Sequence, residues 1–325
     1  MLKKLFGLAL GAAAGIAATT AAFILLGNRR LDKWETLTQE DAGAGDFVTL
    51  SDGTRMHYLS RSPERQLQEA QSKDDVILIH GLMDSAQQWS KNDDALAHTR
   101  RVWAIDLIGF GFSSRVTTPT YSMKMFARSI REFMDAQGIA RASIVGHSLG
   151  GAVALEFAHD YPARVDKLVL IAPATYLLQF RPELKSAKHL PFVPRALIGW
   201  TMTNRRARER ALRDALGDPA HFDPAELARR VRPTRVKGTG DALVAMLGSP
   251  RGSDLPKNLE RIAAPTLVVW GDKDRAVPLR HGRYHAQTLP NAKFVIIEKA
   301  GHIPQFEYPD VVNKLMLSFL SDGLQ

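Results

Sequence analysis

The sequence predicts an α/β fold, a mostly parallel sheet with flanking helices on both faces. Two patterns predict it: short, uniformly apolar runs recur along the chain, and longer stretches with helical spacing separate them. A strand covered by helices on both faces has no polar side, so it shows as such a run. The runs that we interpret as strands are Val76–Ile79, Val102–Ile105, Ser143–Val145, Leu168–Ile171, Leu267–Trp270 and Phe294–Ile297.

The first element is an apolar segment at the amino terminus. Residues 5–26 carry no charge, and a helix of that length reaches roughly 33 Å, enough to cross a membrane. A cleaved signal peptide is the alternative, but the run is long for one and ends without a small-residue cleavage site. We expect residues 1–27 to be a retained single-pass anchor, in the inner membrane if the source is bacterial. Basic residues flank both ends, so the orientation is poorly determined, with the periplasmic side favoured for the rest of the chain.

Gly7, Gly11 and Gly15 repeat within this segment at a spacing that lets two helices approach closely. A homodimer through this face is one interpretation, and accidental spacing in an Ala/Gly-rich helix is the other. Residues 28–45 carry no periodic pattern and end in Gly43-Ala44-Gly45, so we interpret them as a linker.

A hairpin and two amphipathic helices complete the predicted core. Phe47–Leu50 and Met56–Leu59 flank an Asp52-Gly53 turn, while Met123–Gln137 and Leu149–Tyr161 have helical spacing. The alternation stops over residues 174–258, where proline recurs and no convincing strand occurs. We interpret this stretch as a helical cap inserted between the two parts of the core, residues 46–173 and 259–325.

The candidate nucleophile is Ser148. It lies in Gly146-His147-Ser148-Leu149-Gly150, directly after one predicted strand and at the start of a predicted helix. A G-x-S-x-G nucleophile elbow requires that context, because small residues at both ends permit a tight turn that exposes the hydroxyl. His147 adjoins the serine but is expected to point the other way.

A serine needs a base, and the base needs an orienting acid. His302 follows the last predicted strand, so its loop should reach the sheet edge that carries the serine. Asp272 and Asp274 both follow the preceding strand, and the chain order of serine, acid and histidine leaves both open.

Two backbone amides, those of Leu82 and Leu149, are the candidates for the oxyanion hole. Leu82 lies in the loop after the first parallel strand, and Leu149 follows the serine. Both N–H groups are expected to converge on the oxyanion of a tetrahedral intermediate. His80 is expected to fix the first loop, and Asp106 to close a glycine-rich loop as a structural residue.

With these motifs the chain resembles the α/β-hydrolase family, in its capped serine esterase and lipase type, from residue 46 onward. The motifs are His80-Gly81, Asp106–Gly111, the elbow at Ser148, Gly271…Asp274…Pro278 and Gly301-His302-Ile303-Pro304. The resemblance implies that Asp274 is the acid. The combination of anchor and cap is similar to membrane-anchored monoacylglycerol lipases and bacterial membrane-bound (lyso)phospholipases.

The resemblance also makes some reactions of the family less compatible with this sequence than others. Epoxide hydrolases and haloalkane dehalogenases carry aspartate at the elbow, where this chain has Ser148. Carbon–carbon hydrolases of aromatic degradation typically have tryptophan after the catalytic histidine, where this chain has Ile303. The sequence holds no dinucleotide fingerprint, phosphate-binding loop, metal-ligand cluster or cysteine, so we expect no cofactor and no metal.

Most of the net charge of +9 lies in the predicted cap, whose residues 174–258 carry a net +8. Within it, the apolar stretch 196–202, which includes Trp200, precedes the arginine-rich stretch 205–213. This pattern is typical of an element that binds an anionic membrane surface. A cap helix with solvated arginines is the alternative, and no recognition motif for nucleic acid accompanies the charge.

The sequence thus predicts a membrane-anchored serine ester hydrolase that acts on acyl lipids such as monoacylglycerols or (lyso)phospholipids. Ser148 would form an acyl-enzyme, His302 would transfer the protons and Asp274 would orient His302. A serine carbon–carbon hydrolase of the meta-cleavage-product type, a thioesterase and a non-catalytic membrane scaffold are the alternatives.

Overall fold

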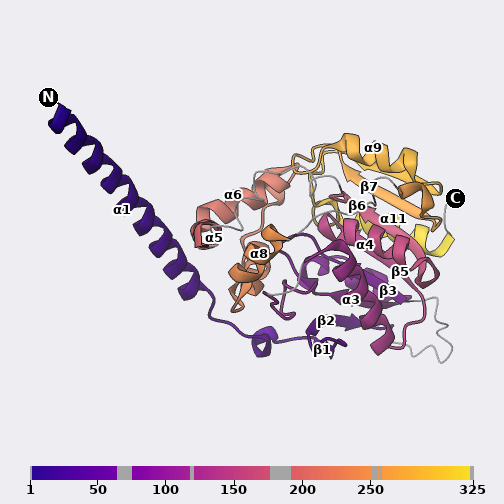
Figure 1. The fold of residues 1–325 in the computed structure, drawn as a ribbon. Coiled ribbons are helices and arrows are strands. Elements are labelled where there is room, and N and C mark those ends of the chain that lie inside the picture. The colour runs from indigo at the N-terminus through magenta and orange to yellow at the C-terminus, as the bar shows by residue number, and fades with distance from the viewer. Residues whose placement is uncertain are drawn as a thin grey trace.

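The computed structural model describes residues 2–63, 75–117, 121–175, 192–249, 255 and 258–322. Of the amino-terminal helix, side chains are described from Ala18 onward. Helices pack around a central sheet, and the first helix projects away from this body toward the amino terminus (Figure 1).

Within the described residues, eight strands form a single sheet in the order β1-β2-β4-β3-β5-β6-β7-β8. The first two strands form the predicted hairpin, β2 also pairs antiparallel with β4, and all other pairs are parallel. The mostly parallel α/β sheet is therefore confirmed. The strands are β1 (Asp46–Thr49), β2 (Arg55–Arg61), β3 (Asp75–Ile79), β4 (Arg101–Ile105), β5 (Ala142–His147), β6 (Val165–Ile171), β7 (Thr266–Gly271) and β8 (Ala292–Ile297).

Side chains alternate between the two faces of this sheet, and both faces are buried. Along β3, Ile77 and Ile79 join the core that contains Phe126 and Phe157, whereas Val76 and Leu78 join the opposite core. This double burial is why the strands are uniformly apolar in sequence.

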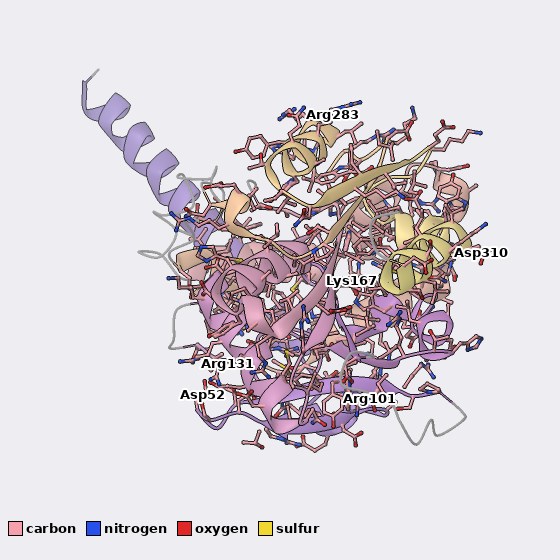
Figure 2. All side chains as sticks on the ribbon, turned by 90° about the vertical axis from the view of Figure 1, so that its right-hand side faces the viewer. Asp52, Arg101, Arg131, Lys167, Arg283 and Asp310 are labelled. Carbon is pink, nitrogen blue, oxygen red and sulfur yellow. The ribbon has the colours of Figure 1, made fainter. Side chains whose placement is uncertain are left out.

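One face is covered by α3 (Met123–Ala136), α4 (Leu149–Asp160) and α9 (Leu279–Thr288), and the other by α2 (Asp93–Ala97) and α11 (Pro309–Asp322). The hydroxyl of Ser122 caps α3 by accepting a hydrogen bond from the Met125 amide. Charged side chains such as those of Asp52, Arg283 and Asp310 lie at the periphery of the layers (Figure 2).

Between β6 and β7 the described residues 192–249 contain helices and no strand. These are α5 (Phe192–Met202), α6 (Arg205–Ala215), α7 (Pro224–Val231) and α8 (Thr239–Gly248). We call residues 192–249 the cap segment; the domain boundaries at 174 and 258 stay a prediction. The cap segment also contains the 3-10 turns Pro219–His221 and Arg232–Arg235. The short helices elsewhere in the described residues are α10 (Pro304–Glu307) and the 3-10 turns Gln39–Ala42, Ala86–Trp89, Pro162–Arg164 and Leu259–Arg261.

The amino-terminal helix α1 extends from Leu2 to Trp34, so residues 28–34 are helical where the sequence predicts a linker. Its carboxyl-terminal part packs on α5. The rings of Phe23 and Trp200 stack with centroids 5.5 Å apart, and Leu31 is fully buried.

The prediction of a membrane anchor and a membrane localisation is wrong. In the part of the chain that the structure describes, no helix is both long and apolar enough to span a bilayer. The physical reason lies in the carboxyl-terminal half of α1. This half packs on α5 and includes a charged helical turn with Arg29, Arg30 and Asp32. Gly7, Gly11 and Gly15, and with them the predicted homodimer, lie outside the residues whose side chains are described.

Candidate active site

Ser148 occupies a sharp turn between β5 and α4. Its backbone has φ 52° and ψ −113°, a left-handed conformation that a serine adopts only when its surroundings impose it. Glycine is required on both sides of it. A Cβ on Gly146 would lie 2.3 Å from the Gly150 oxygen, and one on Gly150 would lie 2.3 Å from the Ile79 oxygen. The local sequence therefore produces the strained turn that the elbow motif predicts.

The structure brings Ser148, His302 and Asp274 together from three separate loops. Nδ1 of His302 lies 2.8 Å from Oδ2 of Asp274, and Nε2 lies 3.0 Å from Oγ of Ser148. Because a carboxylate only accepts, Nδ1 carries the proton, and Nε2 is free to accept the proton of the Ser148 hydroxyl. These distances fit a nucleophile, a base and an orienting acid. The catalytic roles themselves stay predictions.

The register of the sheet explains this convergence. Ile79 pairs with Gly146, and Gly271 pairs with Ile297, so the loops after β3, β5, β7 and β8 leave the sheet at the same edge. Parallel strands place their carboxyl ends together, which is where chemistry is found in such sheets.

The predicted oxyanion-hole amides are those of Leu82 and Leu149. Among the residues that the structure describes, neither amide donates a hydrogen bond to a protein acceptor. The Leu149 amide also belongs to the first turn of α4, whose dipole favours negative charge. Their role in binding an oxyanion stays a prediction.

His80 and Asp106 hold the neighbouring loops, as expected. Nε2 of His80 accepts from the Leu107 amide at 3.0 Å, while Nδ1 lies 2.7 Å from the Gly81 oxygen. Asp106 is fully buried and accepts from the amides of Ala86 and Phe112 at 2.6 and 2.7 Å.

Sequence reasoning missed the partner of Asp106. Nδ1 of His57 lies 2.7 Å from Oδ2 of Asp106, and its Nε2 lies 2.8 Å from the Ala44 oxygen. Burial lowers the pKa of His57, but the hydrogen bond and the charge of Asp106 outweigh it, so the net pKa is raised. In the sequence, His57 stands within an apolar strand, and no local motif indicates that it pairs with Asp106.

Gln88 and Glu307 were also missed. Gln88 contacts the Gly81 amide and the His147 ring, and Glu307 contacts the Gly301 amide. Gln88 lies 59 residues from His147, and Glu307 also accepts from the Gly217 amide, 90 residues away, so no local motif identifies these contacts. In the described part of the chain no group of three His, Asp or Glu side chains is arranged to hold a metal ion.

Comparison with known proteins identifies the family. Residues 75–309 match the family described as alpha/beta hydrolase fold. The chain is 28% identical to a 2-hydroxy-6-oxononadienedioate/2-hydroxy-6-oxononatrienedioate hydrolase of Paraburkholderia phymatum, over 88% of this chain and 99% of the relative. It is 30% identical to a 2-hydroxy-6-oxo-6-phenylhexa-2,4-dienoate hydrolase of Burkholderia cepacia, over 85% and 96%.

A crystal structure of a meta-cleavage product hydrolase superposes with a TM-score of 0.68 at 23% identity, over 86% of this chain and 98% of the other, which shows the fold alone. These relatives do not support the finer resemblance to monoacylglycerol lipases and membrane-bound (lyso)phospholipases. They favour the carbon–carbon hydrolase alternative over the lipid-ester interpretation. The chain belongs to the α/β-hydrolase fold family, and it is a hydrolase.

Proposed function

We propose that the protein hydrolyses the carbon–carbon bond next to a ketone in a vinylogous diketone acid, with Ser148 as the nucleophile. The observation that carries this proposal is the joint presence of an assembled serine, histidine and aspartate and of full-length similarity to hydrolases of 2-hydroxy-6-oxo acids. Fold alone would not support it, because one fold hosts many chemistries.

The proposed reaction is consistent with the two distances that join Ser148, His302 and Asp274. The Ser148 oxygen attacks the ketone carbon while Nε2 of His302 takes the hydroxyl proton, and the Leu82 and Leu149 amides bind the resulting oxyanion. Collapse of this intermediate breaks the carbon–carbon bond. The reacting form is the 2,6-diketone tautomer of the substrate, so the bonding electrons pass through its double bond onto the C2 carbonyl oxygen. That oxygen takes the proton from His302, and the fragment leaves as a dienol. Water then attacks the acyl-enzyme, again with His302 as base, and releases the acid.

Carbon is a poor leaving group, so the substrate must delocalise the electrons that the broken bond leaves behind. A vinylogous carbonyl provides this delocalisation, whereas a simple ketone does not. The enzyme therefore needs no metal or cofactor for this reaction, provided that Asp274 keeps His302 in the tautomer that accepts from Ser148.

A carboxylic ester or lactone hydrolase is the second candidate, and Ile303 favours it. This residue stands where the resemblance places tryptophan in carbon–carbon hydrolases. It is buried against Leu212, Leu216 and Phe306. An ester carries its own oxygen leaving group, so the same three residues would cleave it without delocalisation in the substrate.

The two candidates are separated by one comparison. We expect kcat/KM for a 2-hydroxy-6-oxo-6-phenyl dienoate, followed by loss of its visible absorbance, to exceed that for p-nitrophenyl butyrate by on the order of 10²-fold. Ser148→Ala should abolish both activities. A preference for the ester would replace the first candidate by the second, and full activity of Ser148→Ala would overturn both.

A further inference from the structure

We propose that His147 and Gln88 are positioning residues that hold the oxyanion loop and the base loop at a set distance on either side of Ser148. The oxyanion loop is defined here as residues 80–84, and the base loop as residues 298–303. The proposal rests on the assignment of Ser148 as the nucleophile, and it holds equally for a ketone or an ester substrate.

A continuous chain of hydrogen bonds joins the two loops. The Gly81 amide donates to Oε1 of Gln88 at 2.9 Å, and Nε2 of Gln88 lies 2.8 Å from Nδ1 of His147. Nε2 of His147 then lies 2.8 Å from the backbone oxygen of His302. The chain therefore starts one residue before the Leu82 amide and ends on the catalytic histidine candidate itself.

The chemistry of these groups fixes every proton in the chain. A backbone amide only donates, so the atom of Gln88 that faces Gly81 must be the oxygen. The Gln88 nitrogen then donates to Nδ1 of His147, which must be unprotonated. The remaining proton of His147 sits on Nε2 and is donated to the His302 carbonyl. No other arrangement satisfies all four groups.

Burial keeps this arrangement neutral. His147 and Gln88 are each 2% exposed. Burial holds the pKa of His147 well below its ordinary value, and the charges of His302, Arg230 and His80 act in the same direction. The hydrogen bond to the His302 oxygen raises the pKa but does not offset burial. An imidazolium would also direct an N–H at the donating Gln88 nitrogen, so His147 stays neutral while His302 gains and loses a proton.

The packing around His147 leaves little freedom for either loop. A Cβ on Gly81 would lie 2.9 Å from Nδ1 of His147, and the rings of His147 and His302 have centroids 4.8 Å apart. His147, the second residue of the elbow, thus separates the two loops. Its Nδ1 lies toward Gly81 and its Nε2 toward His302. Loss of these hydrogen bonds would let His302 move relative to Ser148. The distance between Nε2 of His302 and Oγ of Ser148 is 3.0 Å.

The test uses Gln88→Met, which keeps the length of the side chain and removes both of its hydrogen bonds. Gln87→Met is the matched control, because Gln87 is the adjacent, half-exposed residue of the same turn. The readout is the rate constant for covalent labelling of full-length protein by a fluorophosphonate, measured with its apparent binding constant. Labelling needs only the nucleophile, the base and the oxyanion hole.

We expect Gln88→Met to lower the labelling rate constant at least 10-fold with little change in the apparent binding constant, and Gln87→Met to match the wild type. His147→Phe should cause a similar loss, and the double variant Gln88→Met/His147→Phe should be no slower than the slower single variant, because one chain is broken in each. A merely structural role predicts unchanged rates in the folded fraction, or additive losses.

A measurement on the unaltered protein completes the test. Long-range ¹H–¹⁵N correlation of the histidine rings should show His147 protonated on Nε2 and neutral across the pH range of activity. A proton on Nδ1, or labelling of Gln88→Met within 2-fold of Gln87→Met, would overturn the proposal. Absence of labelling in the wild type would instead contradict the assignment of Ser148, and a failed dienoate assay would leave the labelling comparison intact.

Discussion

Asp272 and Asp274 lie two positions apart after β7, yet only Asp274 reaches His302. Oδ1 of Asp274 accepts from the amides of Ala276 and Val277 at 2.9 Å, which turns Oδ2 toward His302. Asp272 instead lies 3.3 Å from the ammonium of Lys273. The turn that follows each carboxylate, rather than its distance along the chain, decides which one faces the histidine.

Asp274→Asn should lower kcat by roughly 10⁴-fold, because an amide nitrogen can face Nδ1 of His302 and stabilise the wrong tautomer. Asp272→Asn is the matched control and should stay within about 2-fold of the wild type. Turnover of p-nitrophenyl butyrate measures both. Equal losses in the two variants would contradict the assignment of the acid.

The pair of His57 and Asp106 couples stability to pH. Burial disfavours the charged form of both side chains. The hydrogen bond and the charge interaction between them outweigh this effect, so the pKa of His57 is raised and the pKa of Asp106 is lowered. The stabilisation from His57 is complete below its unfolded pKa of about 6.5 and is lost as pH rises through the raised folded pKa. That from Asp106 is complete above about pH 4 and is lost as pH falls through its lowered folded pKa.

His57→Asn should therefore lower the free energy of unfolding most between about pH 4 and pH 6.5, and progressively less toward pH 9. Urea denaturation of wild type and variant across this range measures the difference. His98→Asn, at an exposed histidine, is the control. A difference that grows as pH rises would have the wrong sign for a raised pKa.

At the scale of elements, α1 and α5 cross at two glycines. A Cβ on Gly199 would lie 2.1 Å from the Gly27 oxygen, and one on Gly27 would lie 2.7 Å from the Ala196 oxygen. The contact is extended by Trp200, whose Nε1 donates to the Phe23 oxygen at 3.1 Å. The carboxyl-terminal half of α1 thus packs closely on the cap segment.

Gly199→Leu should lower the free energy of unfolding by about 2 kcal/mol, because the added side chain forces the two backbones apart. Leu197→Ala, on the same helix at a position 49% exposed, should change it by less than about 0.5 kcal/mol. The midpoints of urea denaturation at constant slope provide the comparison. An unchanged midpoint for Gly199→Leu would show that the helices separate at no cost.

At the scale of the whole molecule, the cap segment is fastened to the base loop. The His302 amide donates to the Ala215 oxygen at 2.7 Å. Glu307 accepts from the Gly301 amide at 2.7 Å with one oxygen and from the Gly217 amide at 2.8 Å with the other. The cap segment therefore supports the loop that carries the proposed base.

Glu307→Gln should cost roughly 1–3 kcal/mol of stability, since one buried backbone amide would face an amide nitrogen that cannot accept. Glu298→Gln, at an exposed position just before the base loop turns, is the control. Chemical denaturation measures stability, and fluorophosphonate labelling of the folded protein shows whether His302 moves. Wild-type stability in Glu307→Gln would show that this fastening contributes nothing.

The fold also shows what the positive charges of the cap segment contact. Part of the excess positive charge of the cap segment is used within the molecule. Arg195 pairs with Asp32 of α1 and with Asp241 of α8 at 2.8 and 2.7 Å, and the guanidinium of Arg208 lies 4.6 Å from the ring centre of Trp34. The sequence shows where the arginines are, whereas only the fold shows which of them hold α1 to the cap segment.

The amino-acid sequence alone predicts where the strands lie along the chain, two of the helices, the mostly parallel sheet and the turn at Ser148. These features follow from local rules, namely burial on both faces and the small residues that a tight turn requires. It also predicts that Ser148, His302 and one of the carboxylates at 272 and 274 lie together, because their loops follow strands that end at one edge. The choice of Asp274 came from the resemblance to the family.

Only the tertiary structure decided what α1 packs against and how His302 is held. The apolar run of α1 has the composition of an anchor, but composition does not show that Leu31 and Phe23 meet protein. Gln88, His147 and Glu307 act through single hydrogen bonds between residues far apart in the chain, and such contacts leave no periodic pattern. Neighbouring residues determine local geometry. The position of His302, the proposed base, depends instead on which distant segments the packed sheet brings together.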